Sequence, residues 1–372
     1  MTSSPAVTAP AERVRPLELF FDLVFVFTIT QVAGVLTAAP TVDGLGRTVA
    51  LLAIIWWMYG GYAWLTNALD LARPGPRLLL LTGMAAYFVM SLAVPRFFDE
   101  GPFGLILGLA YLAVVLVHTA GFIGTSGHRG ISRLGPLNIV SALIVVAAGI
   151  VPPQARTWVL LGAVALEALS PVIAGIGGFA IGAGHFVERH GLALIILLGE
   201  SIIAVGTVAS ELGDVLRVVV GSVLALVVSA GVWWVYFERE ERDSERLLDA
   251  MPPQRRGRAA LLSFGYAYLA MITGVTMAAV GMKKAVTYFT TPLHDFELWL
   301  LPLGLALYLA GLAAFHRALA PVWEWTRLVA AVAVLLCVPA GLLAGGWLML
   351  LVAGLVLAGV VVVSRTPGLN ET

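Results

Sequence analysis

Twelve long apolar runs constrain this chain more than any other feature. Each run is about 18 to 24 residues long, enough to cross a hydrocarbon core of roughly 30 Å at about 1.5 Å per helical residue. Backbone exposed to lipid must satisfy its hydrogen bonds internally, so the runs predict membrane-spanning helices. The predicted spans are 17–38, 48–69, 77–97, 102–123, 134–152, 156–176, 190–210, 215–237, 259–281, 297–315, 326–344 and 346–364. Only the small residues Ala344, Gly345 and Gly346 mark the junction of the last two, so one long or re-entrant hairpin is an alternative there.

Composition supports this reading and excludes several functions. Of the 372 residues, 60% are hydrophobic and 12% are charged, whereas soluble domains average roughly 45–50% and about 25%. The predicted fold class is therefore an all-α polytopic membrane protein. The 22 basic and 22 acidic residues balance, which gives no reason to expect a nucleic-acid partner. The single Cys337 permits neither a disulfide nor a thiolate metal cluster.

The distribution of arginine and lysine predicts the orientation of the chain. With these spans, sixteen basic residues fall on the side of the N-terminus and six on the other side. Basic residues favour the cytoplasmic side, so both termini are predicted to be cytoplasmic. The N-terminal segment 1–16, the loop 238–258 and the tail 365–372 would then lie in the cytoplasm, around one transmembrane domain formed by 17–364. No lysine falls within a predicted span, which argues against a retinal-type Schiff base.

The first predicted span carries two acids at its start, Glu18 and Asp22. Their i, i+4 spacing places both carboxylates on one face of a helix. An uncompensated carboxylate in a membrane is costly, so an intramembrane acid indicates a functional site by default. For Glu18 the structural alternative is capping of the first helical turn, and for Asp22 it is a satisfied hydrogen bond between helices.

A second informative stretch reads HFVERHGLALIILLGESIIAVG. His185, Glu188, Arg189 and His190 stand at the entrance of the seventh span, and Glu200 follows ten residues beyond His190, about 15 Å deeper. We expect these side chains to share a cytoplasm-facing pocket with the two acids of the first span. The structural alternatives are an interfacial loop and a pairing of the acids with arginine.

Other polar residues within the spans are weaker candidates. Glu167 aligns with small residues on the sixth span, and the Ser170 and Pro171 pair followed by GIGGFAIGAG predicts a kink or an unwound segment. The remaining pocket candidates are His118, Tyr59, Tyr62, Asn67 and Asn138. A single polar side chain of this kind more often has a structural role in helix packing than a role in binding a ligand.

Two stretches, ELFFDLVFVFTITQ and HFVERHGLALIILLGESIIAVG, resemble the bacterial low temperature requirement A family of multi-pass membrane proteins. The resemblance implies a protein of the bacterial cytoplasmic membrane linked by name to growth in the cold, and it implies no molecular activity. The positions that match the family motifs are Glu18, Phe21, Asp22, His185, Glu188, Arg189, Gly199, Glu200 and Ser201.

The two motifs also suggest an internal duplication. The first and seventh spans both begin with charged residues and carry an acid further in, and they lie six spans apart, which would give two parallel six-helix halves, 17–176 and 185–364. A binding site would then be expected between the halves.

These features leave three hypotheses of function. The leading one is a proton- or ion-coupled transporter of a small solute, with the intramembrane carboxylates as loading sites. The first alternative is a non-catalytic lipid-binding or stress-response membrane scaffold. The second is a membrane enzyme with a metal held by His185, Glu188 and His190, together with Glu18 and Asp22. A non-enzymatic role is favoured, with no cofactor expected beyond bound lipid or metal, and with membrane lipids, an unidentified solute and a second copy of the chain as partners.

Overall fold

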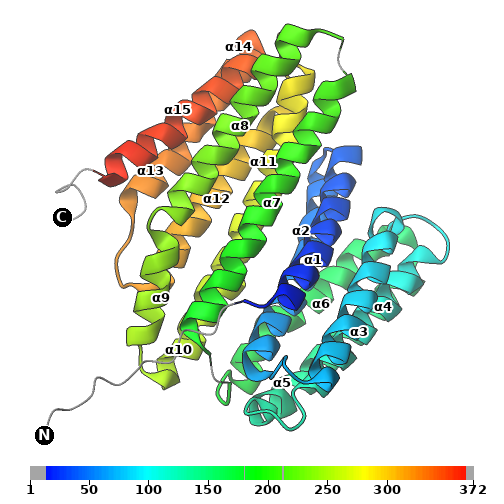
Figure 1. Cartoon of the computed structure of the whole chain (residues 1–372). Coiled ribbons are helices and arrows are strands. Elements are labelled where there is room, and N and C mark those ends of the chain that lie inside the picture. The colour runs from blue at the N-terminus through cyan, green and yellow to red at the C-terminus, as the bar shows by residue number, and fades with distance from the viewer. Residues whose placement is uncertain (1–13, 180, 212, 366–372) are drawn as a thin grey trace, which may run out of the picture.

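A computed structural model of the chain describes residues 14–179, 181–211 and 213–365, with the backbone alone at 210 and 211. Figure 1 shows an all-helical bundle. Within the described residues, twelve helices are long and apolar enough to cross a membrane, which confirms the predicted number of spans. Between Trp325 and Arg365 two such helices are present and meet at Gly345, whose φ of 88° breaks the helix there.

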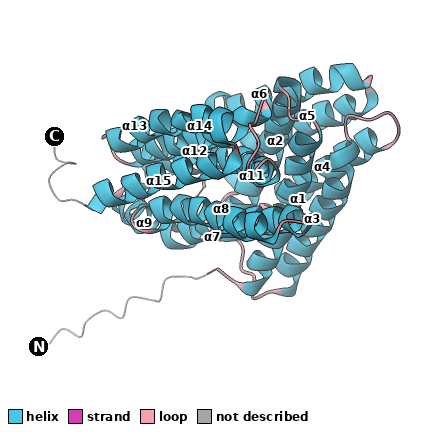
Figure 2. Ribbon diagram, turned by 90° about the horizontal axis from the view of Figure 1, so that it is seen from above, coloured by secondary structure: helices cyan, strands magenta, loops and turns pink. Residues whose placement is uncertain are grey.

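The first six spans form one side of the bundle, on the right in Figure 2. They are α1 (Pro16–Ala38), α2 (Val42–Ala68), α3 (Pro74–Ala93), α4 (Phe103–Gly121), α5 (His128–Ile150) and α6 (Pro153–Ala174), with a short 3₁₀ turn η1 (Val94–Arg96) after α3. The loop after α6 contains Gly175 and Gly178 at positive φ, so the predicted interruption lies in the segment that connects α6 to α7.

The remaining helices form the other side, on the left in Figure 2. They are α7 (Ala183–Glu211), α8 (Val215–Phe237), α9 (Glu240–Ala250), α10 (Pro253–Ala260), the π-helix η2 (Leu261–Ala267), α11 (Tyr268–Thr287), α12 (Glu297–Leu319), α13 (Trp325–Ala333), η3 (Val334–Leu336), α14 (Cys337–Ala344) and α15 (Gly346–Arg365). The predicted loop 238–258 is largely helical. Glu240 and Leu248 of α9 are buried against neighbouring helices.

The two sides of the bundle have the same order of helix neighbours. On the first side α1 packs on α2 and α3, α2 packs on α6, and α3 to α6 pack in succession. On the second side α7 packs on α8 and α11, α8 packs on α15, and α11 packs on α12, which packs on α13. A parallel duplication would produce this pattern, and it stays a prediction. The two sides meet where α1 and α2 contact α7 and α11.

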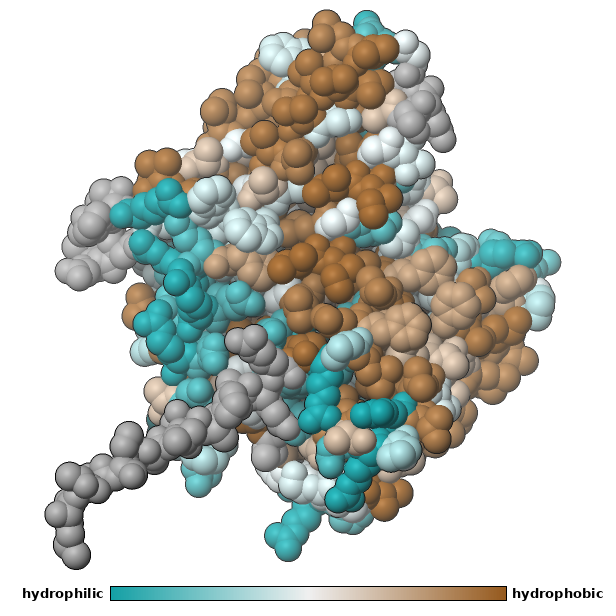
Figure 3. Space-filling model, viewed as in Figure 1, coloured by the Kyte–Doolittle hydropathy of each residue, from teal (hydrophilic) through white to brown (hydrophobic). Residues whose placement is uncertain are grey.

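The molecular surface has the character expected of a protein in lipid. Brown, hydrophobic side chains cover most of the face shown in Figure 3, and teal ones gather at its left and lower edges. Large apolar side chains such as Val172, Val215 and Leu343 are at least 75% exposed. A soluble protein rarely exposes a continuous surface of this kind, so this surface is that of a membrane-spanning protein.

The contact between α11 and α12 depends on glycine. A Cβ atom on Gly274 would lie 2.5 Å from the carbonyl oxygen of Gly304 and 2.6 Å from the backbone nitrogen of Tyr308. Because lipid tails are as apolar as the helices, close backbone approach of this kind supplies much of the helix association energy in membranes.

We therefore expect Gly274→Leu to destabilise the protein by about 1–3 kcal/mol or more, because a side chain there collides with backbone that cannot move aside. The measurement is the temperature at which the detergent-solubilised protein loses its monodisperse peak in size-exclusion chromatography. Gly162→Leu is the matched control, since a Cβ atom at Gly162 meets nothing within 4 Å. Equal melting of the two variants would contradict the proposed role of this contact.

Candidate functional site

One buried arginine binds both acids of the first span. Arg189 of α7 is fully buried, and its Nη1 lies 3.3 Å from Oε1 of Glu18 while its Nη2 lies 3.3 Å from Oδ1 of Asp22. The i, i+4 spacing on α1 thus places one carboxylate at each of the two terminal nitrogens of the guanidinium group. We call Glu18, Asp22, His185 and Arg189 the Arg189 cluster.

His185 completes this cluster in its neutral form. Its Nε2 lies 2.9 Å from Oε1 of Glu18, and its Nδ1 lies 3.1 Å from Nδ2 of Asn67. Oδ1 of Asn67 accepts from the backbone N–H of Gly182 (3.0 Å), which fixes the orientation of the amide. Since the amide nitrogen can only donate, Nδ1 of His185 accepts and Nε2 donates to Glu18. Two carboxylates therefore face a single cation.

Helices α1 and α2 surround the guanidinium with aromatic and polar groups. The rings of Phe21 and Tyr59 lie 5.4 and 5.6 Å from the Arg189 guanidinium carbon, and Thr66 accepts a hydrogen bond from Nη1. The Tyr59 hydroxyl donates to the Arg189 carbonyl oxygen at 3.2 Å. Tyr62 contributes its own carbonyl oxygen at 3.5 Å from Nη1. The cluster joins α1, α2 and α7, the helices at which the two sides of the bundle meet.

The cluster lies toward the side of the bundle at which α1 begins, which we call the Pro16 side. A small pocket lined by Arg15, Glu18, Thr66, Asn67 and His185 reaches it there. Oε2 of Glu18 also accepts from the backbone N–H of Arg15 (3.0 Å), so the predicted capping role is present as well as the ion pair. Glu188 lies beside the cluster and accepts from the backbone N–H of Val14 at 3.2 Å.

Glu200 does not belong to this cluster. It lines a separate cavity of about 240 Å³ between α1, α7 and α11, which we call the Glu200 cavity. This corrects the expectation of one shared pocket. Glu200 follows Arg189 by eleven residues on α7, so the helix rise separates the two by about 16 Å along the axis.

The lining of the Glu200 cavity is largely apolar, but it includes two opposite charges. Its polar lining residues are Thr30, Gln31, Thr37, Glu200, Ser201, Thr276 and Lys283. Glu200 and Lys283 are half-buried, and neither forms an ion pair or side-chain hydrogen bond within the described chain. The neighbouring Lys284 is paired with Glu297 at 2.6 Å.

The ninth predicted span, 259–281, ends before the helix does. Helix α11 continues to Thr287, so Lys283 and Lys284 are both inside it. Hydropathy falls before the helix ends, because its last turns pack against protein and carry polar side chains. For this reason sequence analysis missed Lys283 as a residue of the site.

Glu167 lies in a third environment, within the first side of the bundle. It is buried, accepts from the Tyr111 hydroxyl, and accepts from Oγ of Ser141 at 2.8 Å. It thereby ties α6 to α4 and α5. This arrangement is the interhelical hydrogen bond expected of a structural role.

His185, Glu188 and His190 are not brought together as metal ligands. His190 points into an aromatic environment, where its Nδ1 lies 2.8 Å from the carbonyl oxygen of Phe186. Within the described chain the one group of ligand-type side chains with mutual distances below 4.8 Å is Glu240, His316 and Glu324.

That second group already contains a cation of its own. Nη1 of the buried Arg327 lies 3.3 Å from Oε2 of Glu240, and its Nε lies 3.5 Å from Glu324. A guanidinium in this position opposes a second positive ion. Only Glu324 and Arg327 are close in sequence, at i, i+3 around the start of α13. Glu240 comes from α9 and His316 from α12, so sequence analysis could not find the group.

The family model for the bacterial low temperature requirement A protein, LtrA, matches residues 13–363. The chain belongs to this family. The LtrA-family chain is 28% identical over 315 residues to an uncharacterized protein of Rhizobium meliloti (strain 1021), a match that covers 79% of this chain and 75% of that protein. No solved structure matches. Both Glu18 with Asp22 and the His185 to Ser201 segment lie within the matched range.

We expect Arg189→Met to destabilise the protein by about 3–5 kcal/mol, because it leaves two buried carboxylates without their cation. The triple variant Arg189→Met, Glu18→Gln, Asp22→Asn should recover part of this loss, since no charge then remains unpaired. Apparent melting temperature in detergent is the measurement. Arg246→Gln, at an exposed ion pair, is the control and should change stability little. A single variant as stable as the control would show that the cluster does not join the helices.

Proposed function

We propose that this LtrA-family protein is a carrier that moves a small polar solute across the membrane in exchange or symport with protons. The observation that carries the proposal is the Glu200 cavity, where two unpaired opposite charges, Glu200 and Lys283, face one space between α1, α7 and α11. Unpaired intramembrane charges are costly, and their usual reason is a pathway for a solute or an ion.

The position of the cavity fits alternating access. On α1 the cavity is lined by residues 29–37, which are closer to the end of the helix at Ala38 than Glu18 and Asp22 are. On α7 it is lined by residues 197–204, which follow Arg189 along the helix. The Arg189 cluster therefore joins α1 to α7 on the Pro16 side of the cavity. If the excess of arginine marks the cytoplasmic side, this arrangement is closed toward the cytoplasm.

The Arg189 cluster supplies a means of coupling to protons. With neutral His185, the carboxylates of Glu18 and Asp22 exceed the cation of Arg189 by one charge, and Oδ2 of Asp22 has no hydrogen-bond partner among the described residues. A proton on one carboxylate would neutralise the cluster and weaken its hold on α7. Protonation would thus favour separation of α1 from α7 on the Pro16 side.

The cavity also indicates the class of solute. A solute that carries an amino group and a carboxylate, or one of these with several hydroxyl groups, would pair with Glu200 and Lys283 and with the hydroxyl groups of Thr30 and Thr276. The volume of about 240 Å³ limits it to a small molecule.

A non-catalytic membrane scaffold is the second candidate. The observation that favours it is the internal pairing of the Arg189 cluster, which stabilises the contact of three helices without any ligand. In that case the acids of α1 only join helices, and Glu200 has no transported partner.

The decisive test is proton flux into proteoliposomes that contain a pH dye, under imposed gradients of small amino acids, polyols and common cations. We expect solute-dependent flux from the natural protein and at least a tenfold loss in Glu200→Gln, Asp22→Asn and Gly34→Leu. Gly34 lines the cavity, and a Cβ atom there meets nothing within 4 Å, so the leucine enters the cavity without a clash. Gly162→Leu should retain full flux.

Two results would contradict this proposal. Absence of flux under every gradient, with all variants monodisperse, would favour the scaffold. Flux that persists in both Glu200→Gln and Gly34→Leu would show that the solute does not pass through this cavity.

A further inference from the structure

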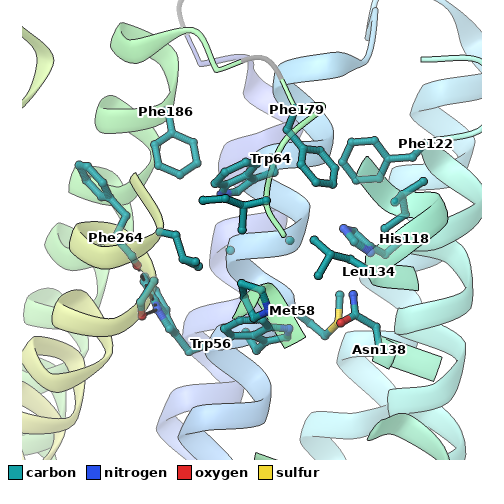
Figure 4. A pocket seen from close by; sticks show the side chains of 18 of the residues that line it. Trp56, Met58, Trp64, His118, Phe122, Leu134, Asn138, Phe179, Phe186 and Phe264 are labelled. Carbon is teal, nitrogen blue, oxygen red and sulfur yellow. Dashed lines mark hydrogen bonds between the residues drawn. The ribbon is translucent and has the colours of Figure 1, made fainter. Parts of the chain in front are cut away.

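A second cavity of different character lies between α2, α4 and α5 on one side and α7 and η2 on the other (Figure 4). We call it the aromatic pocket. Its walls are formed by Trp56, Trp57, Trp64, Phe122, Phe179, Phe186 and Phe264. No lining residue is acidic or a permanent cation. The pocket shares no residue with the Glu200 cavity and is not used by the proposed transport.

One wall presents an unused hydrogen-bond acceptor. His190 is 1% exposed, and its Nδ1 lies 2.8 Å from the carbonyl oxygen of Phe186, so Nδ1 donates. In the neutral ring Nε2 is then an acceptor. His190 is among the residues that line the pocket, and its Nε2 has no hydrogen-bond partner in the described part of the chain.

The opposite wall presents two more unpartnered polar side chains. Asn138 is 6% exposed and its Oδ1 has no hydrogen-bond partner among residues 14–179, 181–211 and 213–365. Neither ring nitrogen of the buried His118 makes a hydrogen bond of normal geometry to those residues. Figure 4 shows His118 and Asn138 close together on the side of the pocket opposite Phe264. Buried side chains with unpartnered polar atoms are rare, so His190 and Asn138, with His118 beside them, around one cavity indicate a ligand.

The backbone on the Phe264 side is also unusual. Residues 261–267 form a π-helix, and Nε1 of Trp56 donates to the carbonyl oxygens of Phe264 (3.2 Å) and Gly265 (2.9 Å). π-Helices are rare and occur frequently at functional sites. Here the π-helix holds Trp56 and Phe264 in place as walls of the pocket.

We propose that the aromatic pocket binds a neutral molecule with a single aromatic ring and a hydroxyl group, a ligand of the phenol type. The ring stacks among the tryptophan and phenylalanine side chains, and the hydroxyl donates to Oδ1 of Asn138 or Nε2 of His190. The volume of about 90 Å³ suits one ring. A cation is disfavoured, because no carboxylate is present to compensate its loss of water.

Calorimetric titration of the full chain in lipid nanodiscs tests this assignment, with empty nanodiscs to subtract partition into lipid. Phenol is the probe, and anisole is its matched control, because its methoxy group accepts but cannot donate. We expect saturable binding of phenol and at least tenfold weaker binding of anisole, since an unpaired acceptor in the pocket penalises the analogue that lacks the donor.

Two kinds of variant connect binding to the pocket. Asn138→Leu and His190→Phe should each reduce the preference for phenol over anisole at least threefold. If either fails to fold, Gly60→Leu replaces it. Gly60 lines the pocket, and a Cβ atom there meets nothing within 4 Å, so the leucine fills the pocket without a clash and should abolish binding. Gly34→Leu, which fills the Glu200 cavity, should bind phenol normally, and this separates failure of this inference from failure of the transport proposal.

The inference is overturned if phenol does not bind, if anisole binds equally well, or if Gly60→Leu binds as the natural protein does. Tighter binding of phenyltrimethylammonium than of phenol would also overturn it, in favour of a cation held by the aromatic rings.

Discussion

The burial of one guanidinium between two carboxylates governs the arrangement of this protein. Arg189 cannot be left unpaired inside a membrane, and neither can Glu18 or Asp22. Their ion pairs require α1 and α7, which lie far apart in the chain, to meet at one depth and in one rotation. Helix α2 then closes the third side with Tyr59 and Thr66. The contact between the two sides of the bundle follows from these requirements.

Around that contact the protein alternates tight packing with open space. Glycines bring α11 and α12 into backbone contact, whereas α1, α7 and α11 leave the Glu200 cavity, and α2 and η2 leave the aromatic pocket. Hydrocarbon gives helices little reason to associate beyond close packing and polar contacts. The charged Glu200 cavity and the aromatic pocket at the junction of the two sides are therefore features that the fold maintains at a cost.

The pattern of the sequence predicted the membrane class, the twelve spans and the family from local information alone. It also placed Glu18, Asp22, His185 and Arg189 in one site, because the i, i+4 acids and the charged entrance of the seventh span are both visible along the chain. It placed Glu200 in that site as well, whereas in the structure Glu200 lines a separate cavity. Lys283 was missed because the predicted span ended two residues before it, and Arg327 was missed because its partner Glu240 lies on a distant segment.

The sequence by itself determined where the helices are, since a run of apolar residues long enough to cross lipid is a one-dimensional property. It also determined that the acids of α1 share a face, since that depends only on helical periodicity. The tertiary structure decided which charges meet, that Glu200 and Lys283 face a common cavity, and that His118, Asn138 and His190 surround another. These depend on the rotation, tilt and depth of each helix against its neighbours. In lipid those variables are set by side-chain packing between distant segments and not by any local pattern.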